Sequence, residues 1–341
     1  MANWSEILAE VSASEGDLDR VRRKYLATLH GVTKRNVIAF YSGWLQKPGI
    51  RTPDFEINDA KMTGFMTVIN KLDRKLGLDL ILHTPGGEIN ATEALVNYLR
   101  YAFNGDIRAI VPHQAMSAGT MISLACKSIV MGAHSSLGPI DPQVGGAPAH
   151  GILEEFRKAQ EAFKQNPHEA KAWLPILEKY TPTLVGKCER AVEMAEKIVG
   201  SWLETGMLNG QADAVKLKEK ILEEFGSHKL SLDHGRHFNY DKVKAIGVTV
   251  ERLEDDAPLQ DAVLSVHHAF TVTLMQSMAT SIIENHIGSA FVNQMAIPPQ
   301  LQLPPGIVQI PNSPVPGPRS GLPIPPPTNE PTEPASQPAG S

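Results

Sequence analysis

The feature that most constrains the fold is a repeated alternation of short apolar runs with longer helical stretches. The apolar runs, each bounded by turn-forming residues, lie at 36–41, 78–83, 107–111 and 128–131. Helical stretches follow the first three runs, at 58–72, 91–103 and 117–126. Because parallel strands need long crossover connections, this pattern predicts an α/β fold with a mostly parallel sheet covered by helices.

The second half of the chain is predominantly helical. Amphipathic stretches are expected at 152–164, 187–203 and 212–225, with a short helix at 241–245 and an extended piece at 248–252. The run 262–283 carries no charge and has the length of a membrane span, but it holds too many polar residues for hydrocarbon. We interpret it as an amphipathic or buried helix; a membrane-surface helix is the alternative.

The composition excludes several classes of function. Two cysteines, outside any C-x-x-C pair, exclude a disulfide framework and argue against a zinc site. A net charge of −5 with interspersed charges gives no footprint for nucleic acid. The acidic N-terminal stretch is unlike a targeting peptide, so we expect a cytoplasmic protein. His234 and His237 have H-x-x-H spacing, but no carboxylate or cysteine cluster accompanies them, so we expect no metal.

Proline is concentrated at the C-terminus, where 15 of the 26 prolines follow residue 297. Such a segment buries too little apolar surface to offset its ordering entropy, and we expect disorder there. The sequence therefore divides into four parts. These are an N-terminal helical segment at 1–35, a main domain at 36–255, a helical segment at 256–296 and a proline-rich tail at 297–341.

Two turns, each between a strand and a helix, carry candidate chemistry. In the first, Gly86 and Gly87 allow a sharp turn that leaves backbone amides aimed outward, although two glycines can also be merely convenient there. In the second, Ser117 begins a helix, where an N-cap is the common role of a serine. Successive ends of parallel strands share one edge, so both turns should face one crevice. A serine beside two backbone donors is the minimum for acyl transfer.

The motifs around these turns resemble the serine dehydrogenase proteinase family. They are Tyr-Ser-Gly-Trp-Leu-Gln-Lys-Pro at 41–48, Leu-Asp-Leu-Ile-Leu-His-Thr-Pro-Gly-Gly at 78–87, Ala-Met-Ser-Ala-Gly-Thr-Met at 115–121 and Ser-Ser-Leu-Gly-Pro-Ile-Asp-Pro-Gln at 135–143. That family is related to the Clp protease proteolytic subunit, signal peptide peptidase A and the crotonases. The resemblance implies a Clp/crotonase-like spiral of β-α-β units with additional C-terminal helices, and a peptidase that needs no cofactor.

The resemblance also implies roles for particular residues. Ser117 matches the nucleophile, and the Gly86-Gly87 turn and Ala118 match the source of the oxyanion-hole amides. The general base is less direct. Asp141 stands where Clp-type proteases place a histidine, and His150 stands near the position of the lysine in signal peptide peptidases. We expect His150 to be the base and Asp141 to orient its ring or to serve the turn, with Lys158 as the other candidate base.

The expected function is serine-dependent hydrolysis of a peptide or protein substrate. A crotonase-like acyl-CoA enzyme and a non-catalytic oligomeric scaffold are the alternatives. Relatives assemble into rings or stacks, so we expect a homo-oligomer, with the apolar stretches at 191–203 and 262–283 as candidate interfaces. No transmembrane segment points to a membrane, although membrane association is not excluded.

Overall fold

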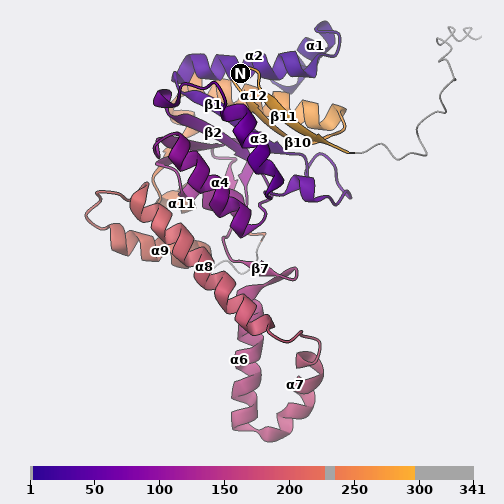
Figure 1. The fold of residues 1–341 in the computed structure, drawn as a ribbon, viewed down its shortest axis with the longest axis vertical. Coiled ribbons are helices and arrows are strands. Elements are labelled where there is room, and N and C mark those ends of the chain that lie inside the picture. The colour runs from indigo at the N-terminus through magenta and orange to yellow at the C-terminus, as the bar shows by residue number, and fades with distance from the viewer. Residues whose placement is uncertain (1–2, 227–234, 296–341) are drawn as a thin grey trace, which may run out of the picture. The chain divides into compact units, whose positions relative to one another are not determined.

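The computed structural model describes residues 3–226 and 235–295, which belong to one compact unit (Figure 1). The expected proline-rich tail at 297–341 and His234 lie outside the described residues. The division at residues 35 and 255 therefore does not separate the described part of the chain into independent bodies.

A seven-stranded sheet organises this unit, in the order β11-β10-β1-β2-β3-β5-β9. The strands β1, β2, β3, β5 and β9 are parallel, β10 runs antiparallel to β1, and β11 runs antiparallel to β10. The strand bounds are β1 (Asn36–Ser42), β2 (Leu78–His83), β3 (Ile107–Val111), β5 (Ser128–Met131), β9 (Val250–Arg252), β10 (Ala279–Asn285) and β11 (Ala290–Gln294). The predicted mostly parallel α/β sheet is confirmed.

The central strands read as continuous apolar runs because both of their faces are covered. Every residue of β1 and β2 is buried. The buried carboxylate of Asp79 within β2 is compensated by Arg35 Nε and Arg108 Nη2, each at 2.9 Å from a carboxylate oxygen. Two hydrogen-bonded guanidinium groups replace the water that this carboxylate loses, which is how an ionised side chain is tolerated inside the sheet.

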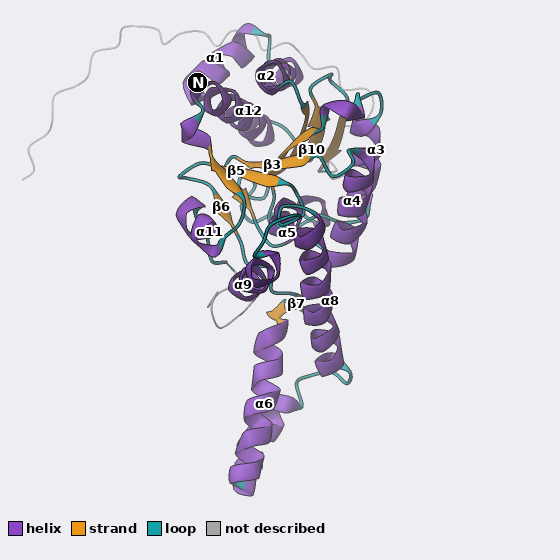
Figure 2. Ribbon diagram, turned by 90° about the vertical axis from the view of Figure 1, so that its left-hand side faces the viewer, coloured by secondary structure: helices purple, strands orange, loops and turns teal. Residues whose placement is uncertain are grey.

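Helices cover both faces of the sheet (Figure 2). One face packs against α2 (Leu18–Thr33) and α12 (Ala257–Gln276) through Val37, Ala39 and Tyr41 of β1. The alternate β1 residues Ile38 and Phe40 point into the other core. The helices that contribute to this second core are α3 (Ala60–Ile69), α4 (Ile89–Ala102), α5 (Ala118–Leu124), α8 (Leu184–Thr205), α9 (Ala214–Gly226) and α11 (Tyr240–Ile246). The helical stretches expected from the sequence match these helices to within a few residues.

Shorter elements complete the chain. A helical arm extends from the body that contains the sheet. The helix α6 runs away from this body, α7 folds back beside α6, and α8 returns toward it (Figure 1). The arm and the small strands before it are β4 (Gln114–Ala115), β6 (Ser136–Leu137), β7 (Gln143–Val144), β8 (Ala147–Pro148), α6 (Ala149–Gln165), η3 (Pro167–Glu169) and α7 (Ala170–Leu177). The remaining elements are α1 (Trp4–Ala13), η1 (Pro53–Phe55), η2 (Arg74–Leu76) and η4 (Leu253–Asp255).

The expectation of one helix at 262–283, in a helical segment at 256–296, is wrong. The helix α12 ends at Gln276, and β10 and β11 then add two strands to the sheet. The run is uncharged because a buried helix and a buried strand adjoin in it, and burial alone does not distinguish the two. The buried residues of α8 and α12 pack into this chain's own core. An interface on the remaining surface of these helices stays a prediction. No helix within the described ranges is long and apolar enough to cross a membrane.

Candidate active site

The glycine turn after β2 is held against a neighbouring loop by backbone hydrogen bonds. The Ile57 N–H donates to the Gly86 carbonyl, and the Glu88 N–H donates to the Ile57 carbonyl, both at 2.8 Å. Gly86 has a φ of +112°, and a Cβ there would lie 2.7 Å from the Cβ of Ser117. A Cβ on Gly87 would lie 2.2 Å from the Ile57 carbonyl oxygen. Both positions therefore require glycine, because a side chain would force apart the segments that meet here.

Ser117 has a strained backbone at the entry to α5. Its φ of +49° and ψ of −112° form a combination that residues other than glycine rarely adopt. The side chain makes no capping hydrogen bond, so the interpretation of Ser117 as a simple N-cap is wrong. Among the described residues, its hydroxyl has no hydrogen-bond partner. Strain of this kind persists only where the surroundings impose it, and it is concentrated at functional sites.

Backbone pairing joins the glycine turn to the segment that carries Ser117. The Thr84 N–H donates to the Gln114 carbonyl at 3.1 Å, and the Met116 N–H donates to the Thr84 carbonyl at 3.0 Å. These bonds continue the parallel pairing of β2 and β3 beyond the ends of both strands. The prediction that both turns face one crevice is confirmed, because the turn and the serine line the same cleft.

The backbone amides around Ser117 differ in whether they already donate a hydrogen bond. The Gly86 N–H is already taken, because it donates to the Thr84 hydroxyl at 3.2 Å. In contrast, the N–H groups of Gly87 and Ala118 donate to no acceptor within the described part of the chain. The Ala118 nitrogen lies close to the turn, since a Cβ on Gly86 would be 3.2 Å from it. Of the three residues expected to supply an oxyanion hole, only Gly87 and Ala118 therefore present a free donor.

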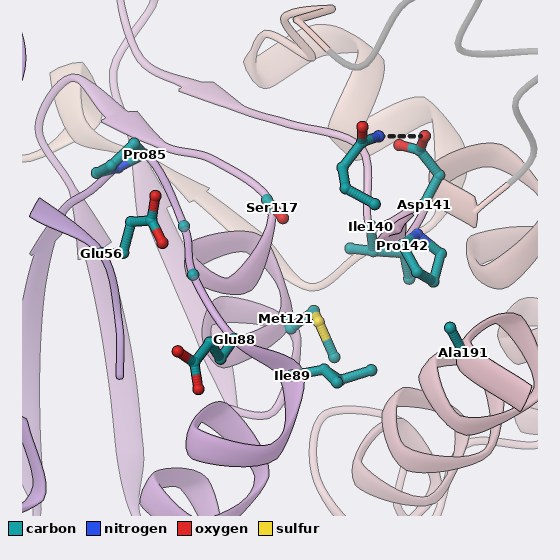
Figure 3. A pocket seen from close by; sticks show the side chains of 13 residues that line it. Glu56, Pro85, Glu88, Ile89, Ser117, Met121, Ile140, Asp141, Pro142 and Ala191 are labelled. Carbon is teal, nitrogen blue, oxygen red and sulfur yellow. Dashed lines mark hydrogen bonds between the residues drawn. The ribbon is translucent and has the colours of Figure 1, made fainter. Parts of the chain in front are cut away.

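Ser117 and both glycines of the turn line a cleft of about 380 Å³ (Figure 3). Figure 3 places Ser117 between the carboxylates of Glu56 and Glu88 on one side and Asp141 on the other. The lining residues are Glu56, Pro85, Gly86, Gly87, Glu88, Ile89, Ser117, Met121, Ile140, Asp141, Pro142, Gln143 and Ala191. No lysine, arginine or histidine is among them. Sequence reasoning missed Glu56, because nothing in the sequence indicates that its loop reaches the glycine turn.

Asp141 enters the cleft on a segment that is tied to the serine helix. The Thr120 hydroxyl of α5 lies 2.9 Å from both the N–H and the carbonyl of Gly138, and it accepts from that N–H. Asp141 is 1% exposed, and Gln143 Nε2 donates to its Oδ2 at 3.4 Å. Asp141 therefore has a defined place in the cleft, across from the glycine turn (Figure 3).

The two candidate bases lie outside this cleft. His150 is the second residue of α6 and is half-buried. The preceding residue, Ala149, donates its N–H to the Pro142 carbonyl at 2.9 Å, which ties the start of α6 to the cleft wall. Lys158 is further along α6, is 56% exposed and pairs with Glu154 at 3.1 Å. The first of the two bases is thus near the rim, and the second is part of a solvated helix face.

A cluster of histidines lies behind the glycine turn. His83 lies at the end of β2, and its ring centroid is 5.5 Å from the ring centroids of both His113 and His267. Its side chain is fully buried and neither ring nitrogen has a hydrogen-bond partner among the described residues. Burial, with a smaller effect from His113, lowers the pKa of His83 to about 3, so this ring is neutral. No group of three or more histidine, cysteine or acidic residues in the described ranges could hold a metal ion.

Comparisons with known proteins give the same relationship as these motifs. Residues 48–250 match the family of ClpP-like SDH-type serine proteinases. The uncharacterized protein MJ1495 of Methanocaldococcus jannaschii is 30% identical over 173 residues, which cover 51% of this chain and 51% of that protein. The uncharacterized protein MJ0137 of the same organism is 47% identical over 77 residues, which cover 23% of this chain and 27% of that protein. The chain thus matches at most about half the length of these two relatives.

The family match spans the parallel strands β2, β3 and β5 together with both turns and the cleft, and it ends at the first residue of β9. The chain belongs to the ClpP-like SDH-type serine proteinases, a family of serine peptidases in the ClpP-like superfamily.

Proposed function

We propose that this protein hydrolyses peptide bonds through an acyl-enzyme on Ser117. The observation that carries the proposal is the strained serine, whose hydroxyl has no partner among the described residues, in one cleft with Gly87. The amides of Gly87 and of the adjoining Ala118 donate to no acceptor in the described part of the chain. A serine held in this way is accessible to a carbonyl carbon, and the two amides can accept the negative charge that develops on the carbonyl oxygen.

The reaction proceeds in two steps. Ser117 Oγ attacks the peptide carbonyl carbon while its proton passes to the base, and the Gly87 and Ala118 N–H groups donate to the oxyanion. The carbon–nitrogen bond then breaks, and the amine leaves with the proton that the base returns. A water molecule attacks the resulting ester in the same way, releasing the new carboxyl group and restoring the serine hydroxyl.

A general base must accept a proton near neutral pH and must be held close to Ser117, and His150 and Asp141 each meet one of these requirements. Imidazole is the side-chain group that most often serves as a general base near neutral pH. Asp141 lines the cleft and His150 begins the helix tied to its wall. We therefore propose His150 as the base, with its ring turned toward Ser117, and Asp141 as the group that orients it. A peptide is the substrate of this proposal, and a homo-oligomer stays a prediction.

A fluorophosphonate probe, which reacts with activated serines, tests these roles. We expect labelling of the wild type and none of Ser117→Ala. His150→Ala and Asp141→Asn should slow labelling by about 100-fold or more, since each removes part of the proton transfer. Lys158→Ala is the matched control on the exposed face of α6 and should label at the wild-type rate.

Labelling that survives in Ser117→Ala would contradict the nucleophile. Wild-type labelling of His150→Ala together with slow labelling of Lys158→Ala would contradict the base. No labelling of the wild type, with turnover of an acyl-CoA thioester, would favour the crotonase-like alternative.

A further inference from the structure

A second hollow adjoins the Ser117 cleft. It has a volume of about 470 Å³, and Glu56 and Pro85 line both spaces. Pro85 directly precedes the glycine turn, so a peptide that leaves Ser117 across Pro85 enters this hollow. Its volume lies within the range of about 300–1,000 Å³ that is usual for ligand pockets.

The walls of the hollow are mainly apolar. Trp44, Ile50, Pro53, Phe55 and Pro85 line it. Ile50 is 39% exposed, and the Trp44 side chain is only partly buried. These large apolar side chains are accessible to solvent and lie next to the Ser117 cleft. Accessible apolar groups of this kind are typical of a surface that a ligand covers when it binds.

The loop that builds these walls is held at both ends, so the hollow is preformed. Lys47 Nζ, itself 8% exposed, donates to the carbonyls of Leu274 and Ser277. The Ser42 hydroxyl donates to the Phe55 carbonyl at 2.8 Å, and Lys61 Nζ donates to a carbonyl of the same loop at 2.7 Å. A preformed wall costs little ordering entropy when a ligand binds.

The Trp44 wall of the hollow is backed by a neutral ring. The Trp44 ring lies against the ring of His83, with centroids 4.4 Å apart. The lowered pKa of His83 leaves this ring neutral at physiological pH. The charged members of the lining, Arg51 and Glu56, have opposite signs, so the hollow as a whole favours an apolar group over an ion of either sign.

We infer that this hollow is a substrate subsite that takes a bulky apolar side chain, aromatic or branched aliphatic, of the peptide whose backbone lies at Ser117. The occupant is a peptide side chain because the hollow continues the catalytic cleft through shared walls. The inference rests on the proposed function, and it names a substrate class: peptides with such a residue on the side of the scissile bond that crosses Pro85.

Peptide binding to the Ser117→Ala protein tests the subsite without any need for turnover. The probes are two fluorescein-labelled decapeptides of glycine and serine, one of which carries a single phenylalanine at its centre, followed by fluorescence anisotropy. Burial of a phenylalanine side chain predicts that this peptide binds about tenfold more tightly than the other. Adding Ile50→Ser should remove most of that difference, and Ile50→Val should retain it.

Leu45→Ser is the matched control. Leu45 lies in the same loop and is 42% exposed, but it does not line the hollow. This variant should preserve the preference for phenylalanine. Equal affinity for the two peptides, including no binding of either, would overturn the inference, as would equal effects of Ile50→Ser and Leu45→Ser.

Two further measurements separate the alternatives. Sedimentation of the Ile50→Ser protein tests whether a second copy of the chain occupies the hollow. If the Ile50→Ser protein forms a smaller assembly than the Leu45→Ser protein, a second copy occupies the hollow and the inference is overturned. Fluorophosphonate labelling of otherwise wild-type protein with Ile50→Ser should be unchanged, because the probe is small and reacts at the serine. Absent labelling of the wild type would count against the proposed function, whereas lost peptide preference with intact labelling would count against the subsite alone.

Discussion

Replacing Ser117 with glycine should stabilise the protein while abolishing its chemistry. The φ of +49° and ψ of −112° at this position suit glycine but not residues with a Cβ. Ser117→Ala keeps the Cβ and therefore keeps the strain, whereas Ser117→Gly relieves it. The two variants both lack the proposed nucleophile, so the difference between them isolates the cost of holding a side chain in this conformation.

The magnitude follows from two opposing terms. A residue held in a sparsely populated region of φ and ψ costs about 1–3 kcal/mol. Glycine loses more chain entropy on folding than alanine does, by about 0.5–1 kcal/mol. The free energy of unfolding of Ser117→Gly should therefore exceed that of Ser117→Ala by about 1 kcal/mol, and at most by about 2.5 kcal/mol. For a chain of this size, each kcal/mol of added stability raises Tm by about 1.5–2 °C.

Thermal unfolding monitored by circular dichroism, with urea unfolding to give the free energies, measures this difference. Neither variant should react with the fluorophosphonate probe. A Tm of Ser117→Gly at or below that of Ser117→Ala would refute the reasoning, since it would mean that the serine backbone is not strained.

Three further predictions concern the surroundings of the nucleophile. Gly86→Ala should lower probe labelling of Ser117 by at least about 100-fold, because the added Cβ meets the serine side chain. The far-ultraviolet circular dichroism spectrum should stay unchanged. Gly145→Ala is the control: it also has a positive φ, of +63°, but it lies in open space and should label normally. The pKa of His83 falls from 6.5 in the unfolded chain to about 3 in the fold, so the unfolded state binds more protons between these values and stability falls as pH drops below 6.5. Between pH 6.5 and 5 this residue should account for about 2 kcal/mol, and urea unfolding of His83→Phe should be less pH-dependent by that amount; an unchanged pH dependence would contradict the neutral ring. Thr120→Val removes a buried hydroxyl that joins two segments and should cost about 1–3 kcal/mol in the same assay, whereas a neutral result would show that water replaces it.

Much of the fold could be predicted because buried parallel strands leave a strong sequence signal. The strand β2 appears as an apolar run since both faces of it are covered, and the helix after it appears through its period. The end of α12 could not be predicted. A buried helix and a buried strand follow one another there, and the uncharged sequence at 262–283 does not show where the helix ends and the strand begins.

The candidate site divides in the same way. The pairing of the glycine turn with Ser117 was predictable, because neighbouring parallel strands end at one edge of a sheet. The approach of Ile57 to Gly87 was not, because it joins segments that no local pattern relates. The Gly86 N–H donates to the Thr84 hydroxyl. This direction could not be predicted, because glycine can adopt many combinations of φ and ψ.

By itself, the sequence determined the class of the fold and the two turns, and it singled out Ser117 as the candidate serine, since these depend on periodicity, on glycine and on motifs that are local in the chain. Only the tertiary structure decided which amides are free, that Asp141 lies in the cleft while His150 lies outside it, and that an apolar hollow adjoins Ser117. These properties arise from contacts between distant segments, and such contacts are set by how the whole chain packs rather than by any short stretch of it.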